Sequence, residues 1–456
     1  MSISPARAIA FEILCRVESE GAYASDLLHT ELDAGIKSAD AALATELTLG
    51  VLRWRRQLDF LLARRLKRPV ERLDLPVALA LRMGLYQLRF LQKIPAPAAV
   101  HESVELARRA RKSSAAPLVN AVLRRAAAEA KLPAEDFLAP NLLVAERIAI
   151  LHSHPTWLVA RYLSLLGETD TIALLESNNR VPRLACAVHD PTHREEILGA
   201  LEESGLRIEP GRLLQSAFIV SGGSPVRTAA FREGKISIQD EASQAVPLLL
   251  GVGARDRVLD LCAAPGGKTP PLVRAAGSSG FVIAADRHAH RLLAMQTQFE
   301  RLGLRCVPLV ELDAAQPLPF NSSFNRILVD APCSGTGTLA RHPEIRWRLR
   351  PEQLNELHRL QSNLLRSALN CLAPGGRLVY STCSLEPEEN EDVVAEVLRD
   401  NPSIRRVPAS EATQELAPHL AAGLDAGGLF SSDGYFRTFP PRHHTDAFFA
   451  ADLEKP

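Results

Sequence analysis

Short aliphatic runs that end in turns of small or polar residues constrain the fold of the second half of this chain. Three of them are the runs at residues 257–261, 326–330 and 378–380, which lead into the turns at 262–269, 331–338 and 381–384. Aliphatic runs of this length, bounded by glycine and proline, are typical of buried strands. Helical patterns separate the runs, so we expect repeated βα units that form a parallel sheet with helices on both faces.

A cysteine follows two of these predicted strands. Cys333 lies in a Pro-Cys-Ser sequence and Cys383 in a Thr-Cys-Ser sequence, both among small polar residues. Ligands of open α/β sheets bind beyond the carboxyl ends of the strands, and loop cysteines near helix N-termini can act as thiolate nucleophiles. Free cysteine is often only a small buried apolar residue, but the polar surroundings favour a nucleophile here.

The turn at residues 262–269 suits a nucleoside ligand, although it lacks both the Gly-x-Gly-x-x-Gly order of a dinucleotide fingerprint and the spacing of a P-loop. Gly266 and Gly267 let a ligand approach the backbone closely. Asp286 ends the next predicted strand, where a carboxylate accepts from ribose hydroxyls. Asp313 follows the third strand and could accept from an adenine amino group. Each aspartate alone could be a helix N-cap or a loop residue, but acidic residues at consecutive strand ends favour a cofactor site.

The N-terminal part has the apolar spacing of helices rather than of strands. Helices are expected at residues 41–52, 57–66, 77–91, 98–111 and 117–130. Residues 51–131 hold 18 Lys and Arg against 6 Asp and Glu, a net charge of +12, although the whole chain has a net charge of zero. Such a concentration of positive charge suits the phosphates of a nucleic acid. A set of solvated basic helix faces is the alternative.

These patterns divide the chain into three expected domains. Residues 1–135 form an all-helical domain that ends at a proline-containing linker. Residues 142–235 hold linker helices and a small α+β domain, with strands at 184–188 and 217–220. Residues 236–456 form the α/β domain.

Composition excludes several other classes of protein. The chain of 456 residues has 46% apolar and 23% charged residues, as soluble globular proteins do, and it has no apolar run long enough to cross a bilayer. Its N-terminus does not resemble a secretory signal. The seven cysteines are scattered without a Cys-x-x-Cys pair, which disfavours structural zinc and a disulfide framework. We therefore expect no metal and a reducing, cytoplasmic location.

Four ordered motifs resemble those of the RNA cytosine-C5 methyltransferases of the NOL/NSUN/Sun family. They are Asp260-Leu-Cys-Ala-Ala-Pro-Gly-Gly-Lys-Thr269, Asp330-Ala-Pro-Cys-Ser-Gly-Thr-Gly337, Arg341-His-Pro-Glu-Ile-Arg-Trp347 and Ser381-Thr-Cys-Ser-Leu-Glu-Pro-Glu-Glu-Asn390. Val104-Glu-Leu-Ala-Arg108 and Val119-Asn-Ala-Val-Leu-Arg124 are similar to the antitermination factor NusB. This fusion is characteristic of the bacterial RsmB (Sun) branch of the family, whose substrate is 16S ribosomal RNA.

The resemblance implies a multidomain protein. Its parts would be an all-α NusB-like RNA-binding domain, a small α+β domain similar to RNA-recognition folds, and a Rossmann-like methyltransferase domain that uses S-adenosyl-L-methionine. The residues implied to line the cofactor pocket are Cys262, Ala263, Ala264, Pro265, Gly266, Gly267, Lys268, Asp286, Asp313 and Asp330. The implied catalytic residues are Cys383, which adds to C6 of the cytosine, Cys333, which assists product release, and Asp330, which binds the ring. Lys268 could also favour the Cys383 thiolate.

Other interpretations remain open at this stage. A non-catalytic RNA-binding or antitermination factor would explain the basic helices, but it has no need of both Cys333 and Cys383. The same chemistry could also act on transfer RNA or DNA. Arg346, Trp347 and Arg348 could contact RNA by charge and stacking, or Trp347 could be buried between its arginines. We expect a monomer whose partner is 16S rRNA, free or in an assembling subunit, without a membrane or a metal.

The chain departs from the family pattern at two places. Ala187-Val188-His189 stands where the family often has Arg-Val-Asn, so an RNA contact of the central domain is missing or replaced. Asp446-Ala-Phe-Phe449 stands where the family has Asp-Gly-Phe-Phe, so this turn is not expected to require a positive φ.

Overall fold

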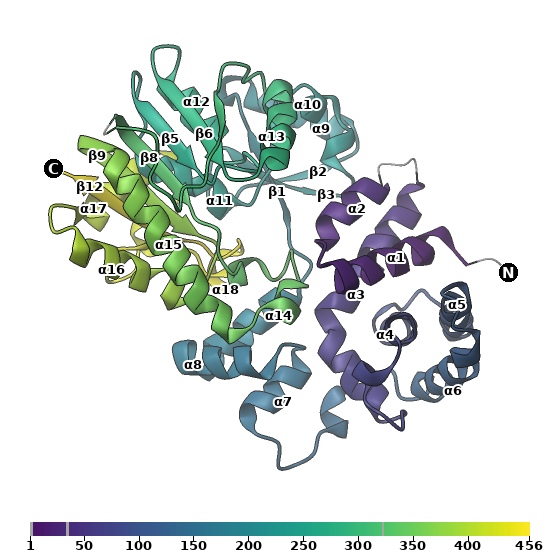
Figure 1. The fold of residues 1–456 in the computed structure, drawn as a ribbon. Helices are drawn as coiled ribbons and strands as arrows, with labels where there is room; N and C mark the ends of the chain where they lie inside the picture. The colour runs from purple at the N-terminus through teal and green to yellow at the C-terminus, as the bar shows by residue number, and fades with distance from the viewer. Residues whose placement is uncertain (1–2, 33–35, 322) are drawn as a thin grey trace. The chain divides into compact units, whose positions relative to one another are not determined.

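The computed structural model describes residues 3–32, 36–321 and 323–456, and the chain divides into two compact units (Figure 1). The helical unit comprises Met1–Val181 and Leu339–Leu349, and the sheet unit comprises Pro182–Thr338 and Arg350–Pro456. In the described part of the chain, no helix is at once long enough and apolar enough to span a membrane. The three predicted domain segments divide the chain at other points, because the helices after residue 142 group with the N-terminal ones.

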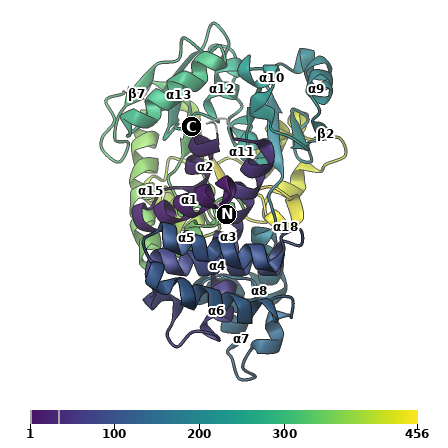
Figure 2. The same ribbon diagram turned by 90° about the vertical axis from the view of Figure 1, so that its right-hand side faces the viewer.

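The helical unit is built around α4 (Leu75–Phe90), a helix that is enclosed by its neighbours (Figures 1 and 2). Four helices pack against it: α1 (Pro5–Glu20), α3 (Ser38–Ala63), α5 (Ala96–Arg109) and α6 (Ala116–Ala127). Twelve of the 16 residues of α4 are buried, as a helix surrounded on all sides requires. Gly84 of α4 is needed at one such contact, because a Cβ there would lie 2.4 Å from Leu123 Cδ1. The predicted all-helical domain is confirmed.

The helix α3 corrects the expected pair of helices at 41–52 and 57–66. It continues without a break through residues 53–56, the polar stretch that separated the two expected helices. These side chains have partners inside the unit: Arg53 donates to the carbonyl oxygen of Ala340 at 3.0 Å, and Arg55 pairs with Glu18 at 2.8 Å. The polar run is therefore a buried turn of a helix and not a connection.

Among the described residues, nine further helices are not part of the bundle around α4 and do not include the four helices that cover the larger sheet. They are α2 (Ala24–Leu32), α7 (Val144–Leu151), α8 (Thr156–Asn179), α9 (Arg194–Glu203), α10 (Ala229–Arg232), α11 (Glu241–Ala245), α14 (Ile345–Arg348), α17 (Ala409–Leu416) and α18 (Pro440–His443).

The segment Leu339–Leu349, which we call the arm, packs into the helical unit although it is far away in sequence. Arg346 of the arm is fully buried. Its guanidinium donates to oxygen atoms at 2.9–3.2 Å, namely the carbonyls of Ser153, Asn178 and Leu339 and the side chain of Asn179. Glu344 accepts from the amide of Ala24 at 3.0 Å. Buried polar groups need such partners, so the arm supplies hydrogen bonds to groups inside this unit.

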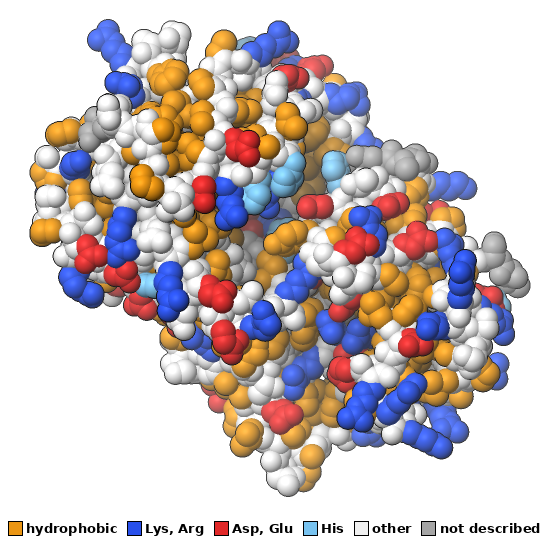
Figure 3. Space-filling model, viewed as in Figure 1, with side chains coloured by type: hydrophobic (Ala, Val, Ile, Leu, Met, Phe, Trp, Pro, Cys, Tyr) orange, Lys and Arg blue, Asp and Glu red, His pale blue; other side chains and the backbone are white. Residues whose placement is uncertain are grey.

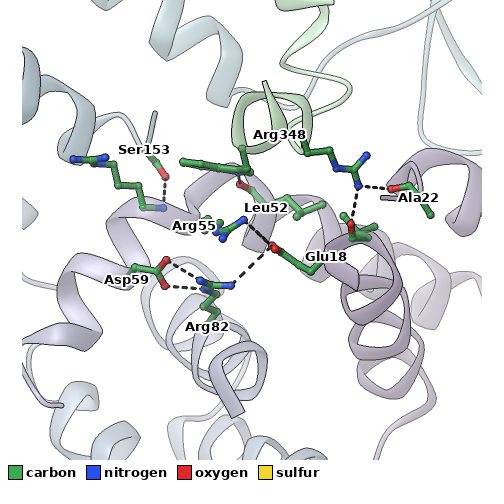
Figure 4. Close-up of polar contacts among 11 residues, drawn as sticks. Glu18, Ala22, Leu52, Arg55, Asp59, Arg82, Ser153 and Arg348 are labelled. Atoms are coloured by element: carbon green, nitrogen blue, oxygen red, sulfur yellow. Dashed lines mark hydrogen bonds and ion pairs between the residues drawn. The ribbon is translucent and has the colours of Figure 1, made fainter. Parts of the chain in front are cut away.

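The two residues that follow Arg346 fasten the arm to α1 and α3 (Figure 4). Trp347 Nε1 donates to the carbonyl oxygen of Leu52 at 2.7 Å. The guanidinium of Arg348 donates to the carbonyls of Val17, Gly21 and Ala22 at 2.5–2.8 Å. The side chains of Arg346, Trp347 and Arg348 therefore have partners inside the helical unit, which favours a structural role over an RNA contact. Trp347 is only half-buried, however, and among the described residues the two arginines bind carbonyl and amide oxygens and not the carboxylates of salt bridges.

The sheet unit contains a small antiparallel sheet with the order β2-β3-β1-β4. Its strands are β1 (Leu184–Val188), β2 (Arg207–Pro210), β3 (Ala217–Ser221) and β4 (Ile236–Ile238). Ile197 and Leu201 of α9 pack on this sheet against Phe218 and Val220. The predicted small α+β domain is confirmed. The sequence did not indicate β2, because Arg-Ile-Glu-Pro is mostly exposed and has no apolar alternation.

The larger sheet of this unit has the order β10-β12-β9-β8-β5-β6-β7. Its strands are β5 (Arg257–Leu261), β6 (Phe281–Asp286), β7 (Leu309–Glu311), β8 (Phe324–Asp330), β9 (Leu372–Thr382), β10 (Arg405–Arg406) and β12 (Phe449–Lys455), with β11 (Phe436–Arg437) paired to β12. The strands from β9 to β7 in this order are parallel, and β12 is antiparallel to β9. This confirms the predicted Rossmann-like domain.

Helices cover both faces of the larger sheet (Figure 1). The long α15 (Pro351–Cys371) and α16 (Glu391–Asp400) pack on one face. The other face is covered by α12 (Thr269–Ala276), α13 (Ala289–Arg301) and the 3-10 turn η6 (Val246–Leu250). The order of the strands reverses between β5 and β8, which makes this the switch point where ligands of such sheets bind.

Replacing Arg346 by Met should destabilise the protein. Methionine fills much of the same volume but donates no hydrogen bond, so several buried carbonyls lose their partner, at a cost of about 3 kcal/mol or more. Chemical denaturation of the full chain measures this change. Arg125→Ala, at an exposed position on α6, is the control and should leave the free energy of unfolding nearly unchanged. Equal stability of the two variants would contradict a structural role for Arg346.

Candidate active site

Acidic side chains lie at the carboxyl ends of neighbouring parallel strands. Asp286 is the last residue of β6 and Asp330 the last of β8, and β5 with Asp260 runs between these two strands. Asp313 follows the end of β7 by two residues. The predicted cofactor carboxylates therefore share one edge of the sheet, on both sides of the switch point.

The two predicted catalytic cysteines are close together. Cys333 follows β8 and Cys383 follows β9, and their Sγ atoms are 3.4 Å apart. The hydrogen bond to Cys383, together with burial, raises the pKa of Cys333 well above its ordinary value. Cys333 therefore stays a thiol, and it is the partner that can donate to a Cys383 thiolate.

Asp330 is held from two sides. Lys268 Nζ lies 2.6 Å from one carboxylate oxygen, and Ser381 Oγ donates to the other at 2.9 Å. The ammonium of Lys268 also lies 5.0 Å from the ring centroid of Phe448. Lys268 was considered from the sequence as a charge that favours the Cys383 thiolate, and the structure directs its ammonium to Asp330 instead.

The glycine turn packs closely against α13. Gly266 has a φ of +95°, and a Cβ on it would lie 2.8 Å from Met295 and 3.0 Å from Phe299. The amide of Ala264 donates to Asp286 at 3.3 Å. Packing against α13 therefore explains Gly266, in addition to the close ligand approach that the sequence suggested. Ala263, Pro265 and Gly267 lie in the same turn, which also contains a cis Ala264–Pro265 peptide bond.

Not every predicted cofactor residue presents its polar group in the same way. The Cys262 side chain packs against the core of the sheet, and burial raises the pKa of its thiol. Asp313 accepts from the amide of Ala315 at 3.1 Å, which is the local loop contact weighed as its alternative. Both residues lie at strand ends, but their side chains contact nearby parts of the protein.

The carboxylates of this edge suit a ligand that donates several hydrogen bonds. Asp260 is fully buried and accepts from Thr269 Oγ1 at 2.6 Å, while its Oδ1 has no partner among the described residues. Burial raises the pKa of Asp260 to about 7. Asp286 is also buried and accepts from backbone amides. Hydroxyls and amines of a nucleoside are donors of the kind that these oxygens accept.

Some residues of the site were not predicted as site residues. Ser381 and Glu389 lie in a motif that the sequence singled out, and Phe448 lies in the C-terminal Asp446-Ala-Phe-Phe449 segment, which was noted only for its turn. Within the described part of the chain, the structure contains no group of three or more His, Cys, Asp or Glu side chains that could hold a metal ion. Ala447 is not among the residues with positive φ, as expected for this departure from the family pattern.

Models of three protein families match consecutive parts of the chain. The model of the 16S rRNA methyltransferase RsmB/F family matches residues 247–454. The NusB family model matches residues 4–128. A model for the ferredoxin-like domain of RsmF/B-like methyltransferases matches residues 154–227.

The similarity to known proteins extends over the whole chain. A protein of Synechocystis sp. named probable ribosomal RNA small subunit methyltransferase B is 33% identical over 458 residues, which cover 99% of each chain. A protein of Bacillus subtilis (strain 168) with the same name is 31% identical, with 100% of each chain covered. The crystal structure of PH0851 superposes with a TM-score of 0.82 and 25% identity over 100% of both chains.

The distance between Cys333 and Cys383 predicts a specific oxidation product. A thiol oxidant such as diamide should remove one hydrogen from each thiol and join the two sulfurs, because they already lie 3.4 Å apart. Peptide mapping by mass spectrometry should then find the peptides of these two cysteines linked. Cys333→Ser is the control in which Cys383 stays free. A link between Cys383 and one of the other five cysteines would contradict the observed geometry.

Proposed function

Because the chain belongs to the 16S rRNA methyltransferase RsmB/F family, whose members use S-adenosyl-L-methionine, we propose that it methylates C5 of a specific cytosine in 16S ribosomal RNA. The observation that carries this proposal is the pair of cysteine sulfurs 3.4 Å apart beside Asp330. A protein that only binds RNA has no need of two thiols at such a distance. The family also explains the NusB-like helices, which an antitermination factor would share.

Cysteine chemistry answers a specific difficulty of this reaction. C5 of cytosine is a poor nucleophile, and addition of the Cys383 thiolate to C6 converts the ring into an enamine whose C5 can attack an electrophile. Asp330 hydrogen-bonds to the ring at N3 or the amino group and stabilises the proton gained at N3. S-adenosyl-L-methionine, when bound, supplies the electrophilic methyl group.

Product release requires the loss of the C5 proton. A base takes this proton, the electron pair re-forms the C5=C6 double bond, and the bond between C6 and Cys383 Sγ breaks. Cys333 is the proposed assistant in this step. The sulfur of Cys333 lies 3.4 Å from that of Cys383, and it loses this sulfur as a hydrogen-bond partner when Cys383 is bound to C6. Cys333 is therefore freed to exchange a proton at that stage.

The proposed cofactor contacts follow from the carboxylates at the strand ends. Asp286 would accept from the ribose hydroxyls, and Asp313 would accept from the adenine amino group. The turn with Gly266 and Gly267 would run along the cofactor, with Lys268 and Asp330 between it and the target base. The buried Oδ1 of Asp260, which has no partner among the described residues, supports a donor-rich ligand at this place.

The helical unit is the proposed RNA-binding part. Figure 3 shows many Lys and Arg side chains on the face of this unit that the view presents. Exposed basic residues that form no ion pair with any described residue include Lys67, Arg68, Arg72, Lys93, Arg111, Arg124 and Arg125. They are free to contact phosphates without first losing an acidic partner.

The target cytosine must leave its stack to present C5 and C6, so we place it in a loop or an opened pair of the RNA. The proposed location is the cytoplasm.

Cys383→Ala should abolish methyl transfer to unmodified 16S rRNA, because alanine has no thiolate that can add to C6. The measurement uses methyl-labelled S-adenosyl-L-methionine and maps 5-methylcytosine in the RNA.

Cys333→Ala should instead accumulate a covalent protein–RNA adduct on denaturing gels, since addition proceeds while release is slowed. Retained turnover of Cys383→Ala, or label on another position of the ring, would exclude the proposed mechanism. Transfer RNA and DNA serve as alternative substrates.

Asp286→Asn should weaken cofactor binding, because an amide can accept from only one of two ribose hydroxyls. Removing one partner of a hydrogen-bonded site costs about 1–3 kcal/mol, which corresponds to a rise in Kd of roughly 5- to 150-fold. Calorimetry with S-adenosyl-L-methionine measures the Kd. Asp433→Asn, at an exposed turn, is the control. An unchanged Kd for Asp286→Asn would exclude the ribose contact.

A further inference from the structure

The loop of Cys333 and the loop of Cys383 are joined by a buried carboxylate that the reaction described above does not use. Glu389 lies at the end of a 3-10 turn (Pro387–Glu389) between β9 and α16 and is fully buried. We propose that Glu389 is a positioning residue, which holds the Cys333 loop against the Cys383 loop so that the two thiols act on the same cytosine. This inference rests on the proposed function, because it assumes the roles given there to the two cysteines.

The contacts of Glu389 reach the residue after each cysteine. Its Oε1 accepts from the amide of Ser334 at 2.8 Å, and its Oε2 accepts from the hydroxyl of Ser334. The same Oε2 accepts from Ser384 Oγ at 2.5 Å. One carboxylate thus binds the immediate neighbours of Cys333 and Cys383, whose sulfurs are 3.4 Å apart. A shift of the carboxylate would move both loops.

Further hydrogen bonds fix the carboxylate itself. Gln361 of α15 donates to Glu389 Oε1 at 2.9 Å, and it also donates to the carbonyl of Pro332, which precedes Cys333. Tyr380 donates from its hydroxyl to the backbone oxygen of Glu389 at 2.6 Å. The network therefore connects α15, β9 and both cysteine loops, and hydrogen bonds from several elements to one buried carboxylate restrict its movement.

The chemistry of the donors explains why this position needs a carboxylate. Four donors converge on two oxygen atoms, each of which accepts two of them. A glutamine has only one oxygen that accepts. Its NH2 group would face two donors, which are either the amide of Ser334 with Gln361 or the hydroxyls of the two serines. Hydroxyls can turn to accept, so Glu389→Gln can keep part of the network. Glu389→Ala loses all four hydrogen bonds of the carboxylate and leaves the buried amide of Ser334 without this partner.

The addition of Cys383 to C6 and the release of the product depend to different degrees on the relative position of the two cysteine loops. Addition to C6 requires the Cys383 thiolate, whereas release also requires Cys333 in the correct place relative to the adduct. Loosening the connection between the loops should therefore slow release more than addition. Displacements of about 1 Å near reacting groups can lower rates by roughly 100-fold, so small movements of the Cys333 loop are sufficient.

The test compares Glu389→Gln and Glu389→Ala with the wild-type full-length chain on unmodified 16S rRNA. The turnover, the KM for S-adenosyl-L-methionine and the fraction of enzyme in the covalent adduct are measured at a temperature where each variant is folded. Glu389→Ala should lower kcat by about 10- to 100-fold with little change in KM and should raise the adduct fraction. Glu389→Gln should lie between it and the wild type.

Glu396→Gln is a matched control. Glu396 of α16 is also a carboxylate with several partners, but these are His358 and Arg366 on α15 rather than the cysteine loops. This variant should have the turnover and adduct fraction of the wild type. An equal rise of the adduct fraction in Glu396→Gln would overturn the proposal, because the effect would then not belong to the cysteine loops. If Glu389→Ala does not fold, Glu389→Gln and Ser384→Ala give the same comparison.

The outcomes separate the positioning role from the proposed function. If Cys383→Ala keeps turnover, the proposed function fails. If Cys383→Ala is inactive but both Glu389 variants match the wild type, only the positioning role is excluded. A fall in turnover without a rise in adduct fraction also excludes it, since general destabilisation alone would give that pattern.

Discussion

Asp330 lies opposite Ser381 in the parallel pairing of β8 with β9, and the arrangement of the candidate active site depends on this register. A slip by one residue would turn the side chains of one strand to the other face of the sheet. The pairing instead puts Ser381 within 2.9 Å of Asp330 and brings the loops of both cysteines to the same edge. Backbone hydrogen bonds thus bring Asp330 and the two cysteine loops to this edge, and the side chain of Glu389 binds to both loops.

Burial gives similar side chains different tasks in this chain. Cys333 and Cys262 both have a raised pKa, yet Cys333 touches another sulfur while Cys262 packs against the sheet. The arginines of the helical unit divide in the same way. The guanidinium of Arg346 donates hydrogen bonds to buried carbonyls, whereas the exposed basic residues of that unit have their charged groups in solvent. Residue type alone therefore does not assign a function, and the partners of each group decide it.

The strand ends of the candidate site could be predicted from the sequence because the information there is local. Aliphatic runs between glycines place Cys333, Cys383 and Asp330 after strands without knowledge of the rest of the chain. The contribution of Glu389 could not be predicted in this way, because it depends on Ser334, 55 residues earlier in the chain. The continuity of α3 was missed for the same reason, since its polar turn is stabilised by the distant Ala340 and not by its neighbours in sequence.

The arm has a consequence for the order in which the chain is completed during its synthesis. Residues up to 181 leave the ribosome first, but the carbonyls of Val17, Leu52 and Ser153 receive their donors only after residues 346–348 have followed. By then the strands from β1 to β8 have already been made. The N-terminal unit is thus the first to begin folding and cannot be the first to finish. Its folding is completed only after most of the sheet unit has been synthesised, so an incomplete chain would contain an incompletely folded helical unit.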